Sequence, residues 1–512
     1  MLMLLRASLI ASFLLIAGCL GAVSSTVKSF VPVGLDPNTP IISQIDKQYR
    51  APLFAVGPEL DRQRNQSTGL GLVSQAELET YLNDQLDRLK IASGIEGLPG
   101  RVYLFADTSF GARASADGNI YIPYAVILDL ESTDEVAALL AHELAHTIRG
   151  HSSTDLFVMV QKKALSASAL FASLRKTDAG GMRDSDLQAL QNTMVSLLVA
   201  DGFINPGWTR LQEEEADKLG LDIMIAAGYN SDAMFALLDK VGHWEELNSQ
   251  KQHERNAIIE NALGSVRLTQ DDTALGNALN SYFNQGATKV GAYVDSLNKN
   301  HDSAVSRYDS VLAYTDLHYG NVAAPALQTE QWDRIARGSS TKAMLQALER
   351  TGEARDAMAR GDLRNGERLI KSAVSTQTNN QNFVRQTFFE LRAAQSKHDS
   401  MKQNLEIGLA GEYPSFLLHV ENIRLKQEPD DKVSQADAQQ LLTTFDAYGR
   451  PADYYNRVVP LLDSAGLSGQ VLALLTECMT KYAGEGISCS VVSAEQSQKN
   501  DLSYKALMNS LL

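Results

Sequence analysis

The sequence TDEVAALLAHELAHTIRG, residues 133–150, has apolar side chains at helical spacing and ends in a glycine. This pattern predicts a helix that ends near Gly150, because glycine is favoured just past a helix end. His142 and His146 are four residues apart in it, so their side chains are offset by only about 40 degrees and project from one face. Both imidazoles can therefore reach one Zn²⁺ ion.

Glu143 follows the first histidine and leaves the helix at a different angle. That angle can place its carboxylate beside the fourth, water-filled metal position, where it can take a proton from the bound water. Chance explains the motif poorly: with 9 histidines in 512 residues, and with all 61 acidic residues counted as Glu, roughly 0.02 such motifs are expected. The motif therefore predicts amide hydrolysis, with Glu143 as the general base.

Such a site needs a third ligand. The metzincin pattern would require Gly and His where this chain has Arg149 and Ser152. The acidic run EEEAD, residues 213–217, supplies a carboxylate instead: Glu213 as the ligand, with Asp217 one turn further on to accept from the outer N–H of a ligand imidazole. We therefore predict a gluzincin-type site that binds one Zn²⁺ per chain through His142, His146 and Glu213.

These residues resemble the M48 family of metallopeptidases, which includes the CAAX prenyl protease, a heat-shock membrane protease and periplasmic proteases of outer-membrane assembly. The first motif is AHELAH, residues 141–146, followed by His151; the second is Arg210, then EEEAD, Gly220 and AGY at 227–229. The resemblance implies a zinc metalloendopeptidase. It also implies that the hairpin predicted for residues 112–122 holds a peptide by strand addition.

The third motif of the family is a His-Pro pair with an Arg six residues after the His. His301 and Arg307 have this spacing, but Asp302 stands where Pro is usual. If the match holds, the resemblance implies that His301 lies near the substrate carbonyl or occupies the open zinc position. One alternative is that His301 is a surface histidine. Another is that His243 or His253 takes the role beside the metal.

The pattern of expected elements indicates an α+β fold that is mainly α. We expect helices at residues 74–91 and 209–227, a strand at 101–105 and only helices beyond about 317. Turns near 360–363 and 397–400 fit two-helix repeats of the tetratricopeptide kind, and plain helical packing fits them equally. The expected parts are a signal peptide (1–18), a tether and N-terminal segment (19–73), a protease domain (74–316, with insertions 152–205 and 250–300) and a helical interaction region (317–512).

The cysteines and the N-terminus predict export. Residues 1–18 have the charge and the short apolar run of a secretory signal, and LIAGC at 15–19 resembles a lipoprotein box that makes Cys19 a lipid anchor. An ordinary signal peptide with an incidental cysteine is the alternative. Leu20 favours the outer membrane, facing the periplasm. In that oxidising compartment we expect Cys478 to pair with Cys489, and two buried thiols are the alternative.

The net charge of -15 argues against a nucleic-acid partner. The main hypothesis is an endopeptidase that cleaves envelope proteins in quality control, with polypeptide substrates and the envelope assembly machinery as a candidate partner. A second hypothesis is a client-binding or assembly factor with latent proteolysis, acting through residues 317–512. The third is a non-catalytic relative, although every residue that the chemistry requires is present.

Overall fold

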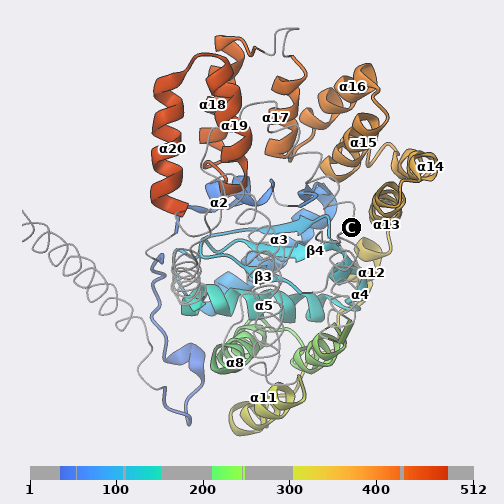
Figure 1. The fold of residues 1–512 in the computed structure, drawn as a ribbon. Coiled ribbons are helices and arrows are strands. Elements are labelled where there is room, and N and C mark those ends of the chain that lie inside the picture. The colour runs from blue at the N-terminus through green and yellow to red at the C-terminus, as the bar shows by residue number, and fades with distance from the viewer. Residues whose placement is uncertain are drawn as a thin grey trace, which may run out of the picture.

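The computed structural model describes residues 35–52, 55–67, 69–107, 111–151, 210–244, 246–247, 304–426 and 432–482. Figure 1 shows a small sheet with α5, α8 and α11 on one side and the C-terminal helices α15 to α20 on the other. The predicted α+β, mainly α fold is confirmed. No helix within these ranges has both the length and the apolar character that a bilayer span requires.

The sheet has four short strands in the spatial order β1-β2-β4-β3. They are β1 (Leu72–Val73), β2 (Val102–Phe105), β3 (Arg113–Ala114) and β4 (Ile120–Pro123). β2 and β4 are parallel, whereas β1 and β3 run antiparallel to their neighbours. The strand predicted at 101–105 and the hairpin predicted at 112–122 are confirmed, and β3 is an edge strand of this sheet.

The two faces of the sheet pack against different parts of the chain. Ile120 and Ile122 of β4 belong to the main core, which includes the helices on the α5 side. Tyr121, between them, points to the opposite face because side chains alternate along a strand. There Tyr121 stacks on Tyr103, and Tyr103 meets the edge of Tyr413 from the loop between α16 and α17.

Helix α5 lies at the centre of the core. It packs against α3 (Ala76–Ser93) and α8 (Arg210–Ala226), while α11 (Ala304–Tyr319) packs against α8 and α4 (Tyr124–Asp129) against β4. α5 itself spans Thr133–Arg149; Ser132 caps its N-terminus by accepting the backbone N–H of Glu135, at 3.0 Å, and Gly150 ends it with φ 65°. Every residue from 133 to 147 is buried, so the metal motif lies inside the protein.

Helix α8 approaches α5 closely at a glycine. A Cβ on Gly220 would lie only 3.1 Å from the backbone nitrogen of His142. A larger side chain there would press on the backbone of the motif helix. The glycine therefore lets α8 bring its acidic residues to the histidines of α5.

The described residues between 35 and 73 include helices and a strand. These elements are η1 (Ile41–Ser43), α2 (Pro58–Asn65) and β1. Ile41 and Ile45 are part of the main core, and the N–H of Ile42 donates to Asp222 of α8 at 2.9 Å. The sequence did not indicate η1 and β1, because a three-residue helix and a two-residue strand leave no periodicity to detect, and α2 has only Pro58 and Leu60 as apolar residues.

The C-terminal region is helical, as predicted. Its helices are α12 (Glu330–Ala336), α13 (Ser339–Ala359), α14 (Leu363–Ala373), α15 (Asn382–Ala394), α16 (His398–Leu409), α17 (Phe416–Arg424), α18 (Gln435–Ala447), η2 (Ala452–Tyr454), α19 (Tyr455–Ser464) and α20 (Ser468–Tyr482). The main core continues past residue 316, because Trp332 is fully buried and its Nε1 donates to the Leu130 carbonyl at 2.7 Å. The tetratricopeptide-like repeat stays a prediction.

Several expectations lie outside the described residues. They are the signal peptide, the lipidated Cys19, the insertions 152–205 and 250–300, His253 and His301. Cys478 of α20 is buried and disulfide-bonded. Its expected partner, Cys489, is also outside the described ranges.

Candidate metal centre

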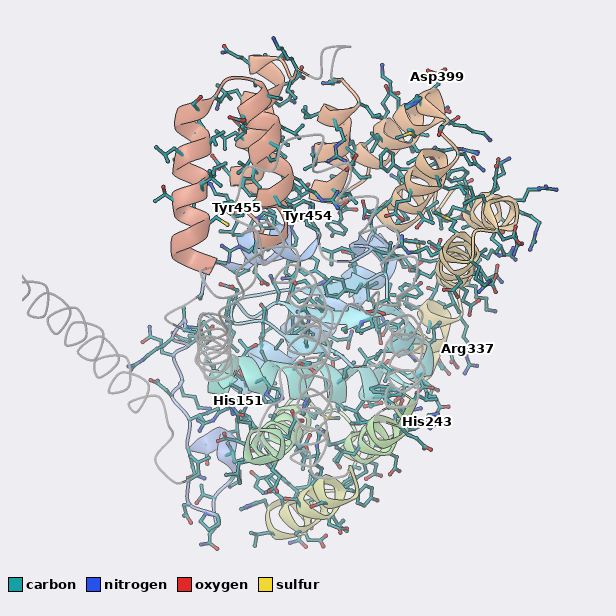
Figure 2. The ribbon with its side chains drawn as sticks, viewed as in Figure 1. His151, His243, Arg337, Asp399, Tyr454 and Tyr455 are labelled. Carbon is teal, nitrogen blue, oxygen red and sulfur yellow. The ribbon has the colours of Figure 1, made fainter. Side chains whose placement is uncertain are left out.

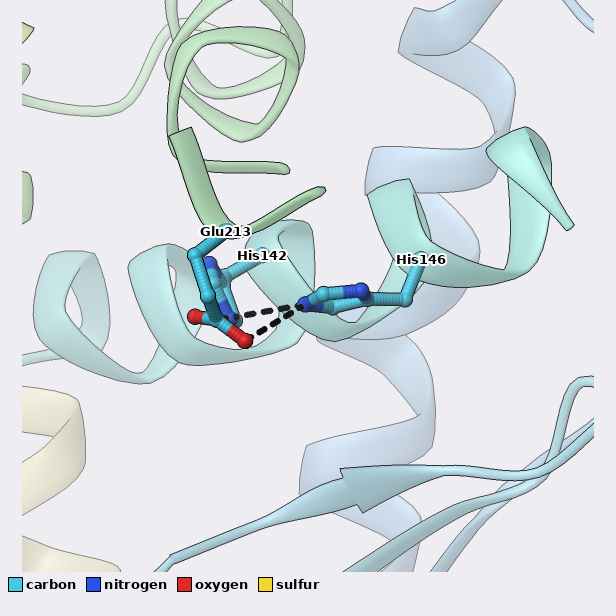
Figure 3. Close-up of side chains that lie close together, drawn as sticks. All are labelled: His142, His146 and Glu213. Atoms are coloured by element: carbon cyan, nitrogen blue, oxygen red, sulfur yellow. Dashed lines mark hydrogen bonds and ion pairs between the residues drawn. The ribbon is translucent and has the colours of Figure 1, made fainter. Parts of the chain in front are cut away.

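Three side chains from two helices converge in the core. His142 and His146 come from α5 and Glu213 from the first turn of α8 (Figure 3). The two Nε2 atoms are 3.1 Å apart, and the Glu213 carboxylate oxygens lie 3.6 Å from Nε2 of His142 and 3.8 Å from Nε2 of His146. All three residues are buried, and one ligand atom of each lies within 4.8 Å of the others.

This cluster fits a zinc ion. Two nitrogens bound to tetrahedral zinc at about 2.0–2.1 Å are about 3.3 Å apart, close to the separation of the two Nε2 atoms. Two imidazoles and one carboxylate are also a donor set typical of catalytic zinc sites, which leave a fourth position for water or substrate. His142, His146 and Glu213 could therefore hold one zinc ion.

Asp217 and Arg307 lie directly behind His142. Oδ1 of Asp217 is 2.9 Å from Nδ1 of His142, the nitrogen that faces away from Glu213. The Arg307 guanidinium donates to both Asp217 oxygens, at 2.7 and 2.8 Å, and Nη1 lies 3.0 Å from Oε2 of Glu213. Burial alone would raise the pKa of Asp217, but the charge and hydrogen bonds of Arg307, together with the hydrogen bond from His142, hold it well below its usual range.

The pKa values of the two histidines are shifted in opposite directions. Burial lowers the pKa of His142, but the hydrogen bond and charge of Asp217 outweigh it, so the pKa is raised. The pKa of His146 is lowered well below its usual value by burial, and the positive charges of His142, His151 and Arg307 act in the same direction. A neutral imidazole is the form that binds zinc, so His146 is ready for a metal at neutral pH.

Glu143 lies between this cluster and the edge of the sheet. The backbone N–H of Ala114, in β3, hydrogen-bonds its carboxylate, whereas Oε2 is buried and has no hydrogen-bond partner among the residues described. Burial raises the pKa of Glu143 to about 7, with Glu213 adding to the increase and His142 and Ala114 opposing it. Such a carboxylate can exchange a proton near neutral pH.

The raised pKa of Glu143 predicts a pH-dependent stability in metal-free protein. An acid whose pKa rises from 4.5 to about 7 on folding lowers the free energy of unfolding as the pH rises through that window. A difference of this size corresponds to about 3 kcal/mol above pH 7. Glu143→Gln keeps an acceptor for the Ala114 N–H and carries no charge. Urea unfolding should therefore find it more stable than the parent at pH 8, with the advantage lost near pH 4; a pH-independent difference would contradict this.

The structure places the remaining predicted residues as follows. His301 lies outside the described residues, so its role stays a prediction. Arg307, which the sequence offered only as the spacing partner of His301, contacts the cluster directly. His243 is exposed and helical, and Figure 2 shows it on the other side of the view from His151. The sequence did not reveal the contacts of His151 and Glu215 described below.

The comparison with known proteins agrees with this geometry. Residues 76–307 match the model of peptidase family M48, a range that begins with the first residue of α3 and ends at Arg307. This part of the chain belongs to family M48. All the residues of the cluster described above lie within this M48 domain.

Curated relatives match over the same part of the chain. One is the beta-barrel assembly-enhancing protease of Yersinia pestis, 25% identical over 170 residues, which cover 33% of this chain and 34% of the relative. Two others, from Escherichia coli, are metalloprotease YcaL (25% over 164 residues; 31% and 55%) and metalloprotease LoiP (25% over 156 residues; 30% and 57%). The chain thus spans between about a third and somewhat over half of the length of these relatives.

Proposed function

We propose that the M48 domain is a zinc-dependent endopeptidase with His142, His146 and Glu213 as the metal ligands. The observation that carries this proposal is the convergence of both Nε2 atoms and the Glu213 carboxylate next to the raised-pKa carboxyl of Glu143. A purely structural zinc site is closed by four protein ligands. Within the described part of the chain the site has three ligands, with the Glu143 carboxylate beside them, which is the arrangement that metal-assisted hydrolysis requires.

Each residue then has one task. When bound, zinc polarises the scissile carbonyl and the attacking water. Glu143 accepts the water proton at its unpartnered Oε2 and returns it to the leaving amine. Asp217 keeps His142 in the tautomer that exposes Nε2, and Arg307 holds both Asp217 and Glu213 in place.

The substrate is an extended polypeptide in this proposal. Among the residues that the structure describes, β3 pairs with β4 and with no other strand, and Ala114 on this edge strand contacts Glu143. A peptide added to the open edge of β3 would therefore run past the general base. His301 would lie near the substrate carbonyl or at the open metal position, as the family resemblance implies.

We further propose that the substrates are envelope proteins and that the activity serves protein quality control. One relative is named a beta-barrel assembly-enhancing protease, which supports a link to outer-membrane assembly. The LIAGC segment supports lipid anchoring at Cys19, and Leu20 supports the outer membrane facing the periplasm. If the turnover of envelope proteins is unchanged in a strain that carries Glu143→Gln, this substrate class is contradicted.

A client-binding or assembly role with latent proteolysis is the second candidate. The observation in its favour is the separate hydrophobic cluster that α17 to α20 form, from Phe416 to Cys478. Deleting residues after Tyr314 would remove the buried Trp332 and damage the main core. Removing residues 416–512 is the better test: client association that survives this deletion would exclude the α17 to α20 cluster as the client-binding part.

Metal removal tests the endopeptidase proposal. We expect a chelator to stop the cleavage of unfolded casein by the purified protein, and we expect stoichiometric zinc to restore it. The reason is that zinc, held by the three ligands, is the group that polarises the scissile carbonyl in this proposal. Magnesium serves as the control, since it prefers six oxygen ligands. Cleavage that continues in the chelator would contradict zinc dependence.

A further inference from the structure

The outer nitrogen of His146 faces a second group of side chains, separate from Asp217 and Arg307. Nδ1 of His146 lies 2.9 Å from Nδ1 of His151, and Nε2 of His151 lies 3.1 Å from Oε2 of Glu215. The other Glu215 oxygen is 2.7 Å from Nη2 of Arg149. His146, His151, Glu215 and Arg149 thus form a chain of contacts that we call the His146 relay.

The end of α5 explains how His151 reaches His146. If the helix continued, the residue five positions later would be about 140 degrees around the helix axis and could not face the same ring. Gly150 instead adopts the left-handed conformation, with φ 65°, and its N–H closes the last turn. The backbone then turns back, and the His151 ring packs edge-on against His146, with centroids 4.9 Å apart.

Zinc binding to His146 determines which ring nitrogen of each histidine in the His146 relay carries the proton. A His146 that binds zinc through Nε2 carries its proton on Nδ1, so Nδ1 of His151 must accept. The proton of His151 is then on Nε2 and donates to Glu215, which also pairs with Arg149. Every group in the relay has a partner of the correct polarity when zinc is bound.

We propose that His151 is the positioning residue of His146, and that Glu215, held by Arg149, fixes the tautomer of His151. The proposal rests on the zinc site proposed above and assigns roles that differ from those of the ligands. His142 is oriented by a carboxylate directly, whereas His146 is oriented through the His151 imidazole, with the carboxylate one residue further away. Outer partners of this kind are worth about 10–100-fold in metal affinity.

Two substitutions at His151 separate positioning from packing. His151→Phe keeps the ring that packs on His146 but removes the nitrogen that faces Nδ1 of His146. His151→Asn loses part of the ring but can keep an oxygen near the position of Nδ1. A positioning role predicts weaker zinc binding for Phe than for Asn, and a packing role predicts the reverse order.

Glu215 offers a second, independent variant pair. Glu215→Leu removes the acceptor for His151, whereas Glu215→Gln retains an oxygen. Because Glu215 acts through His151, the double variant His151→Phe/Glu215→Leu should bind zinc no more weakly than His151→Phe alone. The matched control is Glu214→Leu, on the same turn of α8, where the carboxylate contacts Lys218 and Ser310 rather than the relay.

The experiment is a chelator competition for zinc on the full chain, with the spectrum of the Co²⁺-loaded protein as a second readout. We expect about a 10–100-fold loss of zinc affinity for His151→Phe, a smaller loss for His151→Asn, and parent-like affinity for Glu214→Leu. The Co²⁺ spectrum should change only in the relay variants. Parent-like zinc affinity and Co²⁺ spectrum in His151→Phe would overturn the inference, whereas a parent that binds no zinc would overturn the proposed function instead.

Discussion

Glu143→Gln is expected to lower the rate of casein cleavage by about 10²–10⁴-fold while leaving the zinc content unchanged. The glutamine has nearly the same shape, keeps an acceptor for the Ala114 N–H and is not a ligand in the His142, His146 and Glu213 cluster. It cannot take a proton from water, because an amide oxygen is not basic at neutral pH. Initial cleavage rates and zinc content, measured on the same preparations, test this prediction.

The matched control for this variant is Glu135→Gln. Glu135 is also buried on α5, but it lies two turns before the motif, where it accepts from Glu131 and lies near Lys240. We expect its cleavage rate to stay close to that of the parent. Equal rates for the parent and Glu143→Gln would contradict the general-base role, and loss of zinc from Glu143→Gln would assign the residue to metal binding.

Arg307→Ala has the largest expected effect on stability. The guanidinium is the positive partner of Asp217 and also contacts Glu213, and all three side chains are buried. Removing one member of a buried ionic group leaves uncompensated charge in the core, which costs about 3–5 kcal/mol. We expect the urea midpoint of the metal-free protein to fall accordingly. Zinc affinity should fall as well, since Glu213 and Asp217 lose the group that holds them.

Two other arginine variants serve as comparisons for the loss of stability in Arg307→Ala. Arg307→Lys keeps the charge but cannot bind both Asp217 oxygens in the same fork, so an intermediate loss is expected. Arg355→Ala removes a partly exposed pair with Glu390, at 2.6 Å, and should cost no more than about 1 kcal/mol. If Arg307→Ala were as mild as Arg355→Ala, Arg307 would not be essential for holding the two carboxylates.

The metal ligands could be predicted because they depend on local geometry. The spacing of His142 and His146 fixes one face of a helix, and the acidic run beginning at Glu213 offers a ligand and its neighbour one turn apart. Arg307 could be suggested only through a family motif, because the fold brings it to Asp217 across 90 positions in the sequence. A contact between residues so far apart leaves no periodic pattern in the sequence.

Other features depended on turns and on very short elements. His151 reaches His146 only because Gly150 reverses the chain, so helical spacing alone could not predict this contact. The hairpin β3–β4 was predictable from its Asp-Gly turn, but the parallel pairing of β4 with β2 was not, because strand order depends on tertiary packing. The elements from residue 35 on were missed because η1 and β1 are too short to leave a periodic pattern in the sequence.

The most direct test of the central claim is the zinc content of the purified protein, measured for the parent and for His146→Ala. We predict one zinc per parent chain and almost none in His146→Ala, because the variant loses one of three converging ligands. A parent without zinc, or a His146→Ala variant that retains a full equivalent, would contradict the proposed metal centre.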